Sequence, residues 1–102
     1  MKFKNGAKRS QKCLAYHTIP PGLIRAAAER ATIGLKYGEL NYMKGGEDFF
    51  NEAKNHLMEH WLCYLENNLK DEKKITDHLK AVIWNAGYLL WYEENKRKNP
   101  HI

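Results

Sequence analysis

Cysteine is scarce in this sequence, with Cys13 and Cys63 as the only two among 102 residues. Two cysteines cannot form the disulfide framework of a small secreted domain, so we expect free thiols in a reducing compartment. A positively led apolar run before a small-residue cleavage site is also missing, which disfavours a secretory signal. The longest apolar stretch, near 86–91, is too short to span a membrane. We therefore expect a cytoplasmic protein.

Acidic residues are absent from the first twelve positions, which carry several cations: Lys2, Lys4, Lys8, Arg9 and Lys12. The formal net charge of +5 is therefore a local property of residues 1–18, which show no helical or alternating pattern. We expect this segment to be an extended basic arm. Such an arm attracts polyanions in general, including nucleic acid, nucleoside phosphates and acidic partner surfaces.

The remaining composition is that of one globular domain. The chain is 43% hydrophobic and 12% aromatic, a composition that disfavours disorder. A chain of this length has room for one hydrophobic core. The three tryptophans predict that this core is rich in aromatic rings. We therefore expect residues 1–102 to form a single domain.

Hydrophobic residues recur every three or four positions in three segments, which predicts three amphipathic helices. The first covers about 21–37 and begins with Pro21, because proline suits a first helical turn. The second covers about 47–66. The third follows Asp71 as its N-cap and ends before a solvated tail at 93–102. The expected fold class is all-α: a small bundle of three main helices with a basic N-terminal arm, completed by oligomerisation.

Each predicted helix has one apolar stripe that is expected to face the core. The first stripe comprises Ile24, Ala27, Ala28, Ala31 and Leu35. The second comprises Phe50, Ala53, Leu57, His60 or Trp61, and Tyr64. The third comprises Ile75, Leu79, Val82, Ala86 and Leu89. Trp84 and Trp91 lie off the third stripe, so we expect them at an interface between copies of the chain.

Polar side chains lie close to the stripes of the second and third helices. Asp71, His78 and Asn85 are spaced by nearly two helical turns each and therefore share one face. Together with His60 and Asn68, they can line a pocket that binds a metal, a base edge or phosphates. The alternative is that they are core polar residues, bonded to one another and to the backbone.

Two further patterns suggest metal binding. His56, Glu59 and His60 match the inverted zinc-peptidase motif, but so short a pattern also arises by chance in a charged helix, with His56 facing solvent beside a buried His60. The carboxylates of Glu29 and Asp71 are candidates to hold magnesium against phosphates. Acids at such spacings also decorate solvated helix faces.

The segment between the first and second helices combines glycines with polar and aromatic side chains. Lys36 supplies a cation, Tyr37 and Tyr42 supply stacking faces, and Asn41 supplies an amide edge. Neighbouring glycines allow a ligand to approach the backbone closely. This combination suits a nucleotide. A structural loop that closes a helical hairpin would use the same residues, so both interpretations stay open.

The order of these features resembles the dATP/dGTP diphosphohydrolase N-terminal domain family, a group of phage and bacterial domains similar to all-helical MazG-type nucleotide pyrophosphohydrolases. The resemblance spans nearly the whole chain and is carried by short motifs: Gly6, Ala7, Lys8, Arg9, Ile19, Pro20, Lys36, Tyr37, Gly38, Asn41, Tyr42, Gly45, His60, His78, Leu79, Ala81, Asn85 and Leu89. It implies an all-α fold, phage origin, and binding of purine deoxynucleoside triphosphates with magnesium. Pyrophosphate is released where activity is retained.

The residues and the resemblance together give a set of expected roles. The expected ligand-binding residues are Lys8, Arg9, Lys36, Tyr37, Asn41, Tyr42, His60, Asn68, His78 and Asn85. If the chain is an active enzyme, the catalytic residues are His60, Asp71 and His78. In that case the cofactor is magnesium, with Glu29 and Asp71 as its ligands.

Two departures from the family pattern weaken the case for catalysis. The expected Arg-His pair is Glu59 and His60 in this chain, and the expected Gly-Glu before an aspartate is Asn67 and Asn68. Loss of a cation disfavours phosphate binding, and loss of a carboxylate disfavours magnesium binding. We therefore expect a phage-type sponge that sequesters a purine nucleotide or a nucleotide-derived immune signal in the cytoplasm of an infected bacterial host.

Two alternatives stay open. The first is an active magnesium-dependent dATP/dGTP pyrophosphohydrolase. The second is a nucleic-acid or protein-binding module that uses the basic arm. The second leaves the polar residues near the helical stripes without a role, so we expect a purine nucleotide and further copies of the chain as partners, and neither nucleic acid nor a membrane.

Overall fold

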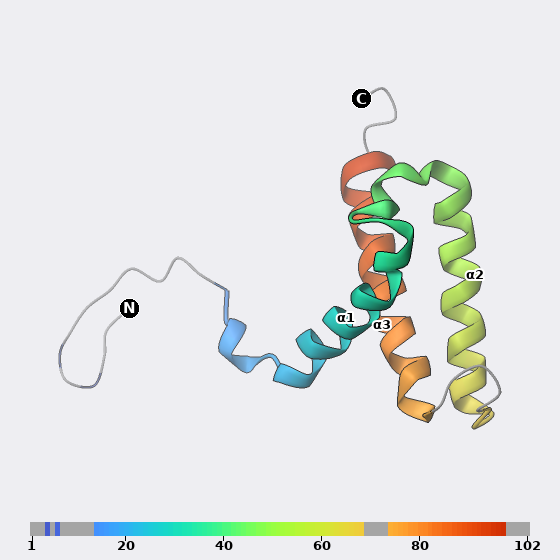
Figure 1. Cartoon of the computed structure of the whole chain (residues 1–102). Helices are drawn as coiled ribbons and strands as arrows, with labels where there is room; N and C mark the ends of the chain where they lie inside the picture. The colour runs from blue at the N-terminus through green and yellow to red at the C-terminus, as the bar shows by residue number, and fades with distance from the viewer. Residues whose placement is uncertain (1–3, 5, 7–13, 69–73, 98–102) are drawn as a thin grey trace.

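The structure is a computed structural model that describes residues 4, 6, 14–68 and 74–97, within which every regular element is helical (Figure 1). The main helices are α1 (Pro21–Ile33), α2 (Gly46–Leu65) and α3 (Ile75–Tyr92). Short helical turns occur at η1 (Tyr16–Thr18), η2 (Gly34–Tyr37), η3 (Asn41–Lys44) and η4 (Glu93–Arg97). The predicted all-α fold with three main helices is confirmed.

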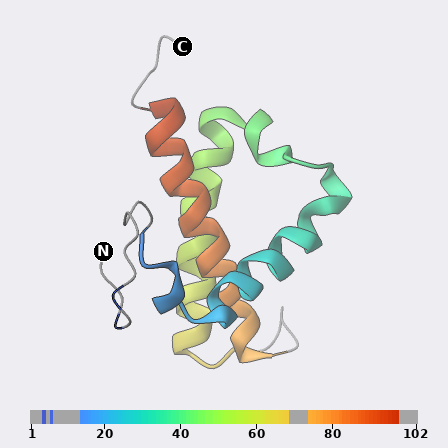
Figure 2. The same cartoon turned by 90° about the vertical axis from the view of Figure 1, so that its left-hand side faces the viewer.

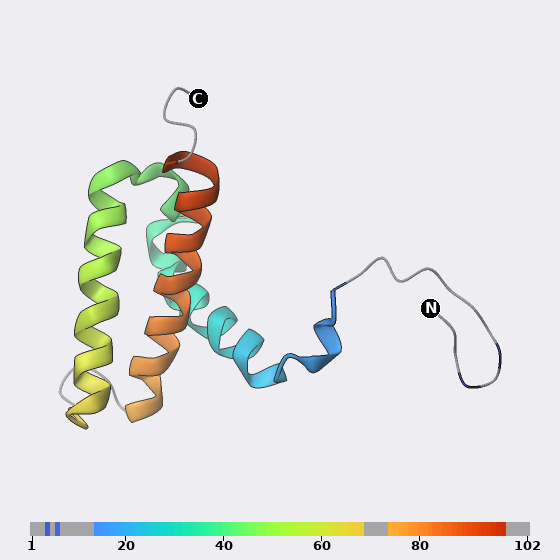
Figure 3. The same cartoon turned by 180° about the vertical axis from the view of Figure 1, so that it is seen from behind.

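α3 is the central element of this arrangement. It runs antiparallel to α2, and the two helices lie side by side as a hairpin (Figure 3). α1 packs on α3, and η2 and η3 then lead the chain back to the start of α2 (Figure 2). Of the predicted basic arm at 1–18, residues 1–3, 5 and 7–13 lie outside the described residues. The prediction of an extended segment is wrong for its last three residues, because Tyr16–Thr18 form the 3-10 turn η1.

The three helices begin and end close to the predicted positions, with three differences. The last turn of the first predicted helix is the separate 3-10 turn η2. α3 begins after Lys74, so the predicted cap Asp71 is wrong; the backbone N–H of Lys74 donates to the Asp77 carboxylate at 3.1 Å instead. After Tyr92 the chain continues for one π-helical turn, η4, although a tail was predicted there.

The stripe of α3 that faces the core differs from the predicted one. The buried residues of α3 are His78, Ala81, Asn85 and Tyr88. The predicted stripe is wrong by one position along the helix: its member Ala86 is exposed, and Ile75 and Leu89 are only half-buried. Two polar side chains therefore occupy core positions that a purely apolar stripe excludes.

α2 buries Phe50, Ala53 and Cys63, so its predicted stripe is largely confirmed. Cys63 is a free thiol, while Cys13 lies outside the described residues. Trp61 is exposed and His60 is half-buried, which decides the choice between them in favour of His60. On the same helix the apolar side chains of Met58, Leu62 and Leu65 are exposed.

The predicted apolar stripe of the first helix is mostly exposed to solvent. Ala26 is the buried residue of this helix, whereas Ile24 and Leu35 are exposed. An ion pair supports the weak apolar contact, because Lys80 Nζ on α3 lies 2.7 Å from Glu29 Oε2. The hydrogen bond to Glu29 raises the pKa of Lys80 above its ordinary value.

Aromatic rings join the start of α2 to the end of α3. Phe50 stacks on Tyr92 with ring centroids 4.2 Å apart, and the centroids of Phe49 and Tyr88 are 4.9 Å apart. Gly45 permits this packing, because a Cβ there would overlap the Phe49 side chain. Tyr88 is 4% exposed, and its hydroxyl has no hydrogen-bond partner in the described part of the chain.

We predict that Tyr88→Phe stabilises the protein by about 1 kcal/mol, because it removes a buried hydroxyl that lacks a partner. Burial raises the pKa of Tyr88, and the nearby Tyr92 adds to the effect. The unfolded chain therefore ionises first as the pH rises past the ordinary value of 10.0, so the free energy of unfolding falls there in the wild type. Urea denaturation at about pH 7 and about pH 11 measures both effects.

The matched control is Tyr37→Phe, since the Tyr37 side chain is exposed and its replacement is expected to leave the free energy of unfolding unchanged. A Tyr88→Phe variant that is less stable than the wild type would show that the hydroxyl makes a stabilising hydrogen bond in solution.

Candidate functional site

A pair of histidines joins α2 to α3. The Nδ1 atoms of His60 and His78 are 3.0 Å apart. His78 is 1% exposed and is the largest fully buried side chain of the described chain. Its second ring nitrogen, Nε2, lies 2.6 Å from the backbone oxygen of Asn68. Both nitrogens of His78 are therefore engaged within the protein.

The hydrogen bonds of the pair assign its tautomers. A carbonyl oxygen can only accept, so His78 Nε2–H donates to Asn68. In neutral His78 the Nδ1 atom then carries a lone pair, and His60 Nδ1–H donates to it. This leaves the lone pair of His60 on its Nε2 atom. Only one proton fits between the two Nδ1 atoms, so the two imidazoles cannot both be cations at the same time in this arrangement.

The end of α2 sets the position of Asn68. Asn67 has a φ of 54°, in the left-handed region that asparagine tolerates better than most residues. The Asn68 N–H donates to the Cys63 oxygen at 2.8 Å, and the Asn67 N–H donates to the Tyr64 oxygen. This is a Schellman-type helix end. It reverses the chain and brings the Asn68 carbonyl to His78.

The structure brings together part of the predicted polar pocket. His60, Asn68 and His78 meet, as the spacing predicted, and they are bonded to one another as the alternative interpretation proposed. Asn85 is buried, but its Nδ2 donates to the Ala81 oxygen of its own helix at 2.8 Å. Asp71 lies outside the described residues.

The predicted loop residues lie on η2 and η3, which contact each other. Lys36 and Tyr37 are exposed on η2, with Lys36 Nζ 5.1 Å from the Tyr37 ring centroid. On η3, Asn41 and Tyr42 are half-buried. The ring of Tyr42 contacts α3, with its centroid 6.3 Å from that of Trp84 and 5.0 Å from that of Trp91.

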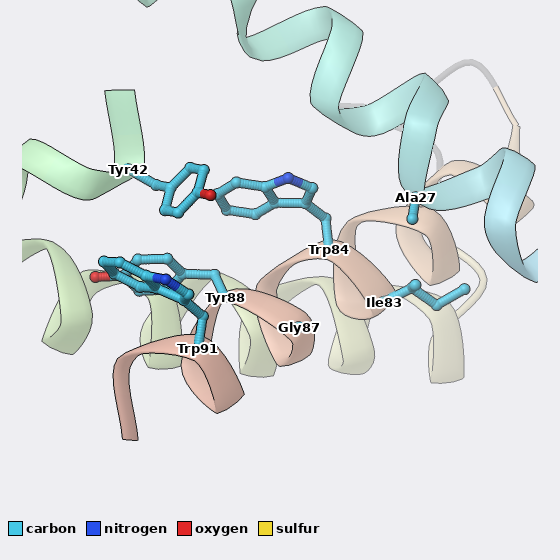
Figure 4. Close-up of a pocket in the computed structure, with 7 residues that line it drawn as sticks. All are labelled: Ala27, Tyr42, Ile83, Trp84, Gly87, Tyr88 and Trp91. Carbon is cyan, nitrogen blue, oxygen red and sulfur yellow. The ribbon is translucent and has the colours of Figure 1, made fainter. Parts of the chain in front are cut away.

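Tyr42 is one wall of an apolar groove that the sequence did not reveal. The groove has a volume of about 250 Å³, and Figure 4 shows that its walls come from α1, η3 and α3: Ala27, Tyr42, Ile83, Trp84, Gly87, Tyr88 and Trp91. The spacing of Trp84, Tyr88 and Trp91 by four and three residues was the available signal, since it places three rings on one side of a helix.

A comparison with known families identifies the chain. The family model described as dATP/dGTP diphosphohydrolase, N-terminal, matches residues 4–100. The chain belongs to this family. The resemblance drawn from the sequence motifs is thereby confirmed. No curated protein and no solved structure matches the chain significantly.

The described residues do not assemble the magnesium site that the sequence motifs predict. In residues 14–68 and 74–97, no three histidine, cysteine or acidic side chains lie close enough to share a metal ion. The carboxylate of Glu29, one predicted ligand, is paired with Lys80. The other predicted ligand, Asp71, belongs to the segment that is not described.

The residues of the zinc-peptidase pattern lie near neighbours on α2. In the zinc-peptidase pattern, His56 is exposed and lies 4.0 Å from Glu52, while Glu59 Oε1 lies 3.7 Å from the Cys63 sulfur. Lys8 and Arg9 lie outside the described residues.

None of the helices that the structure describes is long and apolar enough to cross a membrane.

We predict that His60→Ala destabilises the protein by about 1–3 kcal/mol, because it leaves the buried Nδ1 of His78 without its donor. His60→Asn is expected to recover part of this loss, since an amide N–H can occupy the place of the imidazole Nδ1–H. His56→Ala is the control on the same helix and is expected to change stability by less than about 0.5 kcal/mol. Urea denaturation compares the four proteins; equal stability of all four would contradict the assigned contact.

Proposed function

We propose that this member of the dATP/dGTP diphosphohydrolase N-terminal domain family binds a purine nucleotide or a nucleotide-derived immune signal and sequesters it without hydrolysis. The family assignment supports a nucleotide as the ligand. The protein acts as a phage anti-defence sponge in the cytoplasm of an infected bacterial host. Its pocket is a degenerate relative of a pyrophosphohydrolase site.

The ion pair between Glu29 and Lys80 is the observation that carries the proposal of binding without turnover. The two charged atoms are 2.7 Å apart, so magnesium would have to compete with an ammonium group for the Glu29 carboxylate. The pair also connects α1 to α3. Asn68 supports the same conclusion, because its amide brings no negative charge and its backbone oxygen already accepts from His78.

The loop between α1 and α2 is proposed to contact the ligand. Lys36 and Tyr37 present a cation and an aromatic face on the exposed turn η2. Asn41 adds an amide on η3. These groups suit a phosphate, a ring face and a base edge respectively. Lys8 and Arg9 of the basic arm are proposed to add positive charge to the same ligand.

The alternative is an active magnesium-dependent dATP/dGTP pyrophosphohydrolase, which the family name supports. That function assigns His60, Asp71 and His78 to catalysis and Glu29 and Asp71 to the metal. It requires Glu29 to leave Lys80. A binding module that uses the basic arm for nucleic acid or protein ranks third, because it gives the groove and the loop no role.

The test is incubation of the full chain with magnesium and a panel of purine nucleotides, cyclic dinucleotides and ADP-ribose-derived signals. The solution is chromatographed before and after heat denaturation. We predict that one compound is depleted from solution and returns intact on heating, because the protein holds it without breaking a bond. Repetition with a chelator in place of magnesium is expected to give the same result.

Other outcomes of this experiment decide against the proposal. Release of pyrophosphate that Glu29→Gln abolishes would establish the enzyme, with Lys80→Gln as the control for loss of the ion pair alone. Unchanged peaks for every compound would exclude both nucleotide functions.

We also propose that copies of the chain associate. The exposed apolar side chains of Met58, Trp61, Leu62 and Leu65 form a stripe along the second half of α2, and such a stripe is commonly covered in an oligomer. We predict a solution mass of at least two chains of 12.0 kDa by size exclusion with light scattering. Leu62→Glu is expected to lower the mass, whereas Glu52→Lys, a charge change elsewhere on α2, is not. A wild-type mass of one chain would exclude the oligomer.

A further inference from the structure

The groove between η3 and α3 has the size and the lining of a site for one flat ring. Its volume is about 250 Å³, below the range of about 300–1,000 Å³ that accommodates drug-sized ligands. A whole nucleoside triphosphate therefore does not fit inside it. Four of its seven lining residues are aromatic, and the indoles of Trp84 and Trp91 are only half-buried, so part of their ring surface is open to a ligand.

The rings of the groove are held in fixed relative orientations. Trp84 and Tyr88 are nearly parallel, with an interplanar angle of 6°. Tyr42 stands nearly perpendicular to Trp84 and to Trp91, at 80° and 88° (Figure 4). Tyr42 therefore closes one side of the groove and does not stack over the indole faces. A planar ligand can stack there, as bases do on aromatic platforms in proteins.

Gly87 provides an independent indication that this space is kept open. It lies in the interior of α3, where glycine is less favourable than alanine. A Cβ built on Gly87 would meet no atom within 4 Å, and the residue has an ordinary helical backbone, so neither packing nor conformation requires glycine. Gly87 lines the groove. The helix thus gives up stability at a position where a side chain would take up space beside the rings.

We propose that this groove receives the purine base of the bound nucleotide, stacked against Trp84 and Trp91, while the sugar and phosphates lie outside it. This inference rests on the nucleotide-binding function proposed above. In this arrangement aromatic residues of α3 bind the ring, and the polar residues of the loop between α1 and α2 contact the rest of the molecule. His78, the member of the histidine pair on α3, does not line the groove; it precedes Trp84 by six residues, about 9 Å along a helix.

The experiment is titration of the full chain with dATP, dGTP, cyclic di-AMP and ADP-ribose, each of which carries a purine base. Calorimetry gives the affinity, and thermal unfolding gives the stability. We expect Gly87→Ala to raise the melting temperature by about 4 °C or more, because alanine favours the helix. The same variant is expected to bind at least about tenfold more weakly, because its methyl group narrows the groove. Opposite changes in stability and affinity cannot result from misfolding.

Gly22→Ala is the matched control, since Gly22 lies in α1, a Cβ there also meets no atom within 4 Å, and it does not line the groove. It is expected to leave the affinity unchanged. Tryptophan fluorescence supplies a second measurement: ligand binding is expected to quench emission in Trp61→Phe, which retains both groove indoles, and to lose most of its quenching in a Trp84→Phe, Trp91→Phe double variant.

Three results would overturn the inference. If Gly87→Ala binds the purine ligand within about twofold of the wild type, the base lies elsewhere and the nucleotide-binding function survives. If Gly87→Ala instead changes the mass of the protein in light scattering, the groove is an interface between copies. If the wild type binds none of the four compounds, the proposed function fails together with this inference.

Discussion

The packing of α2 against α3 depends on one buried histidine. His78 occupies a core position of α3 and is bonded in two directions, to the His60 side chain in the body of α2 and to the Asn68 backbone just beyond the end of α2. A leucine at this position would fill the same space but could satisfy neither partner. The Schellman turn at Asn67 fixes where the chain turns after α2, and the bonds of His78 to His60 and Asn68 then fix the register of the hairpin. The aromatic contacts of Phe50 and Tyr88 then complete the other end.

The sequence predicted the positions of the three helices better than it predicted which side of each helix is buried. Spacing of apolar residues located all three helices, because periodicity depends only on the local geometry of a helix. It misplaced the core stripe of α3 by one residue, because His78 and Asn85 are polar and were expected at the edge of the core. Which stripe is buried depends on the partners of each side chain. His78 is acceptable in the core only because His60 of α2 and Asn68 just beyond the end of α2 bond to it. These partners lie 18 and 10 positions away from His78 in the chain.

The candidate site was predictable to a similar extent. Proximity of His60, Asn68 and His78 followed from helical spacing, but their mutual hydrogen bonds depend on the Schellman turn at Asn67, which spacing alone does not reveal. The pairing of Glu29 with Lys80 joins residues 51 positions apart and was equally hidden. The groove was missed for another reason. The contacts of Trp84 and Trp91 with Tyr42 require the η3 loop to fold back onto α3, which helical spacing does not reveal, and the predicted role of these residues at an interface between copies stays a prediction.

Because of these contacts, we expect a ligand to bind at the loop between α1 and α2 and not inside the α2–α3 hairpin. Both nitrogens of His78 are engaged within the protein, so this side chain cannot contact a ligand without giving up a bond that stabilises the core. Asn85 is buried and its Nδ2 donates to the Ala81 oxygen of its own helix. Lys36 and Tyr42 lie on η2 and η3, two turns that pack on each other. A nucleotide combines a flat ring with negative charge, and this loop carries an aromatic wall and a cation within one short segment. A ligand that engages both would fix the loop against α3, so binding and ordering of the loop would be coupled.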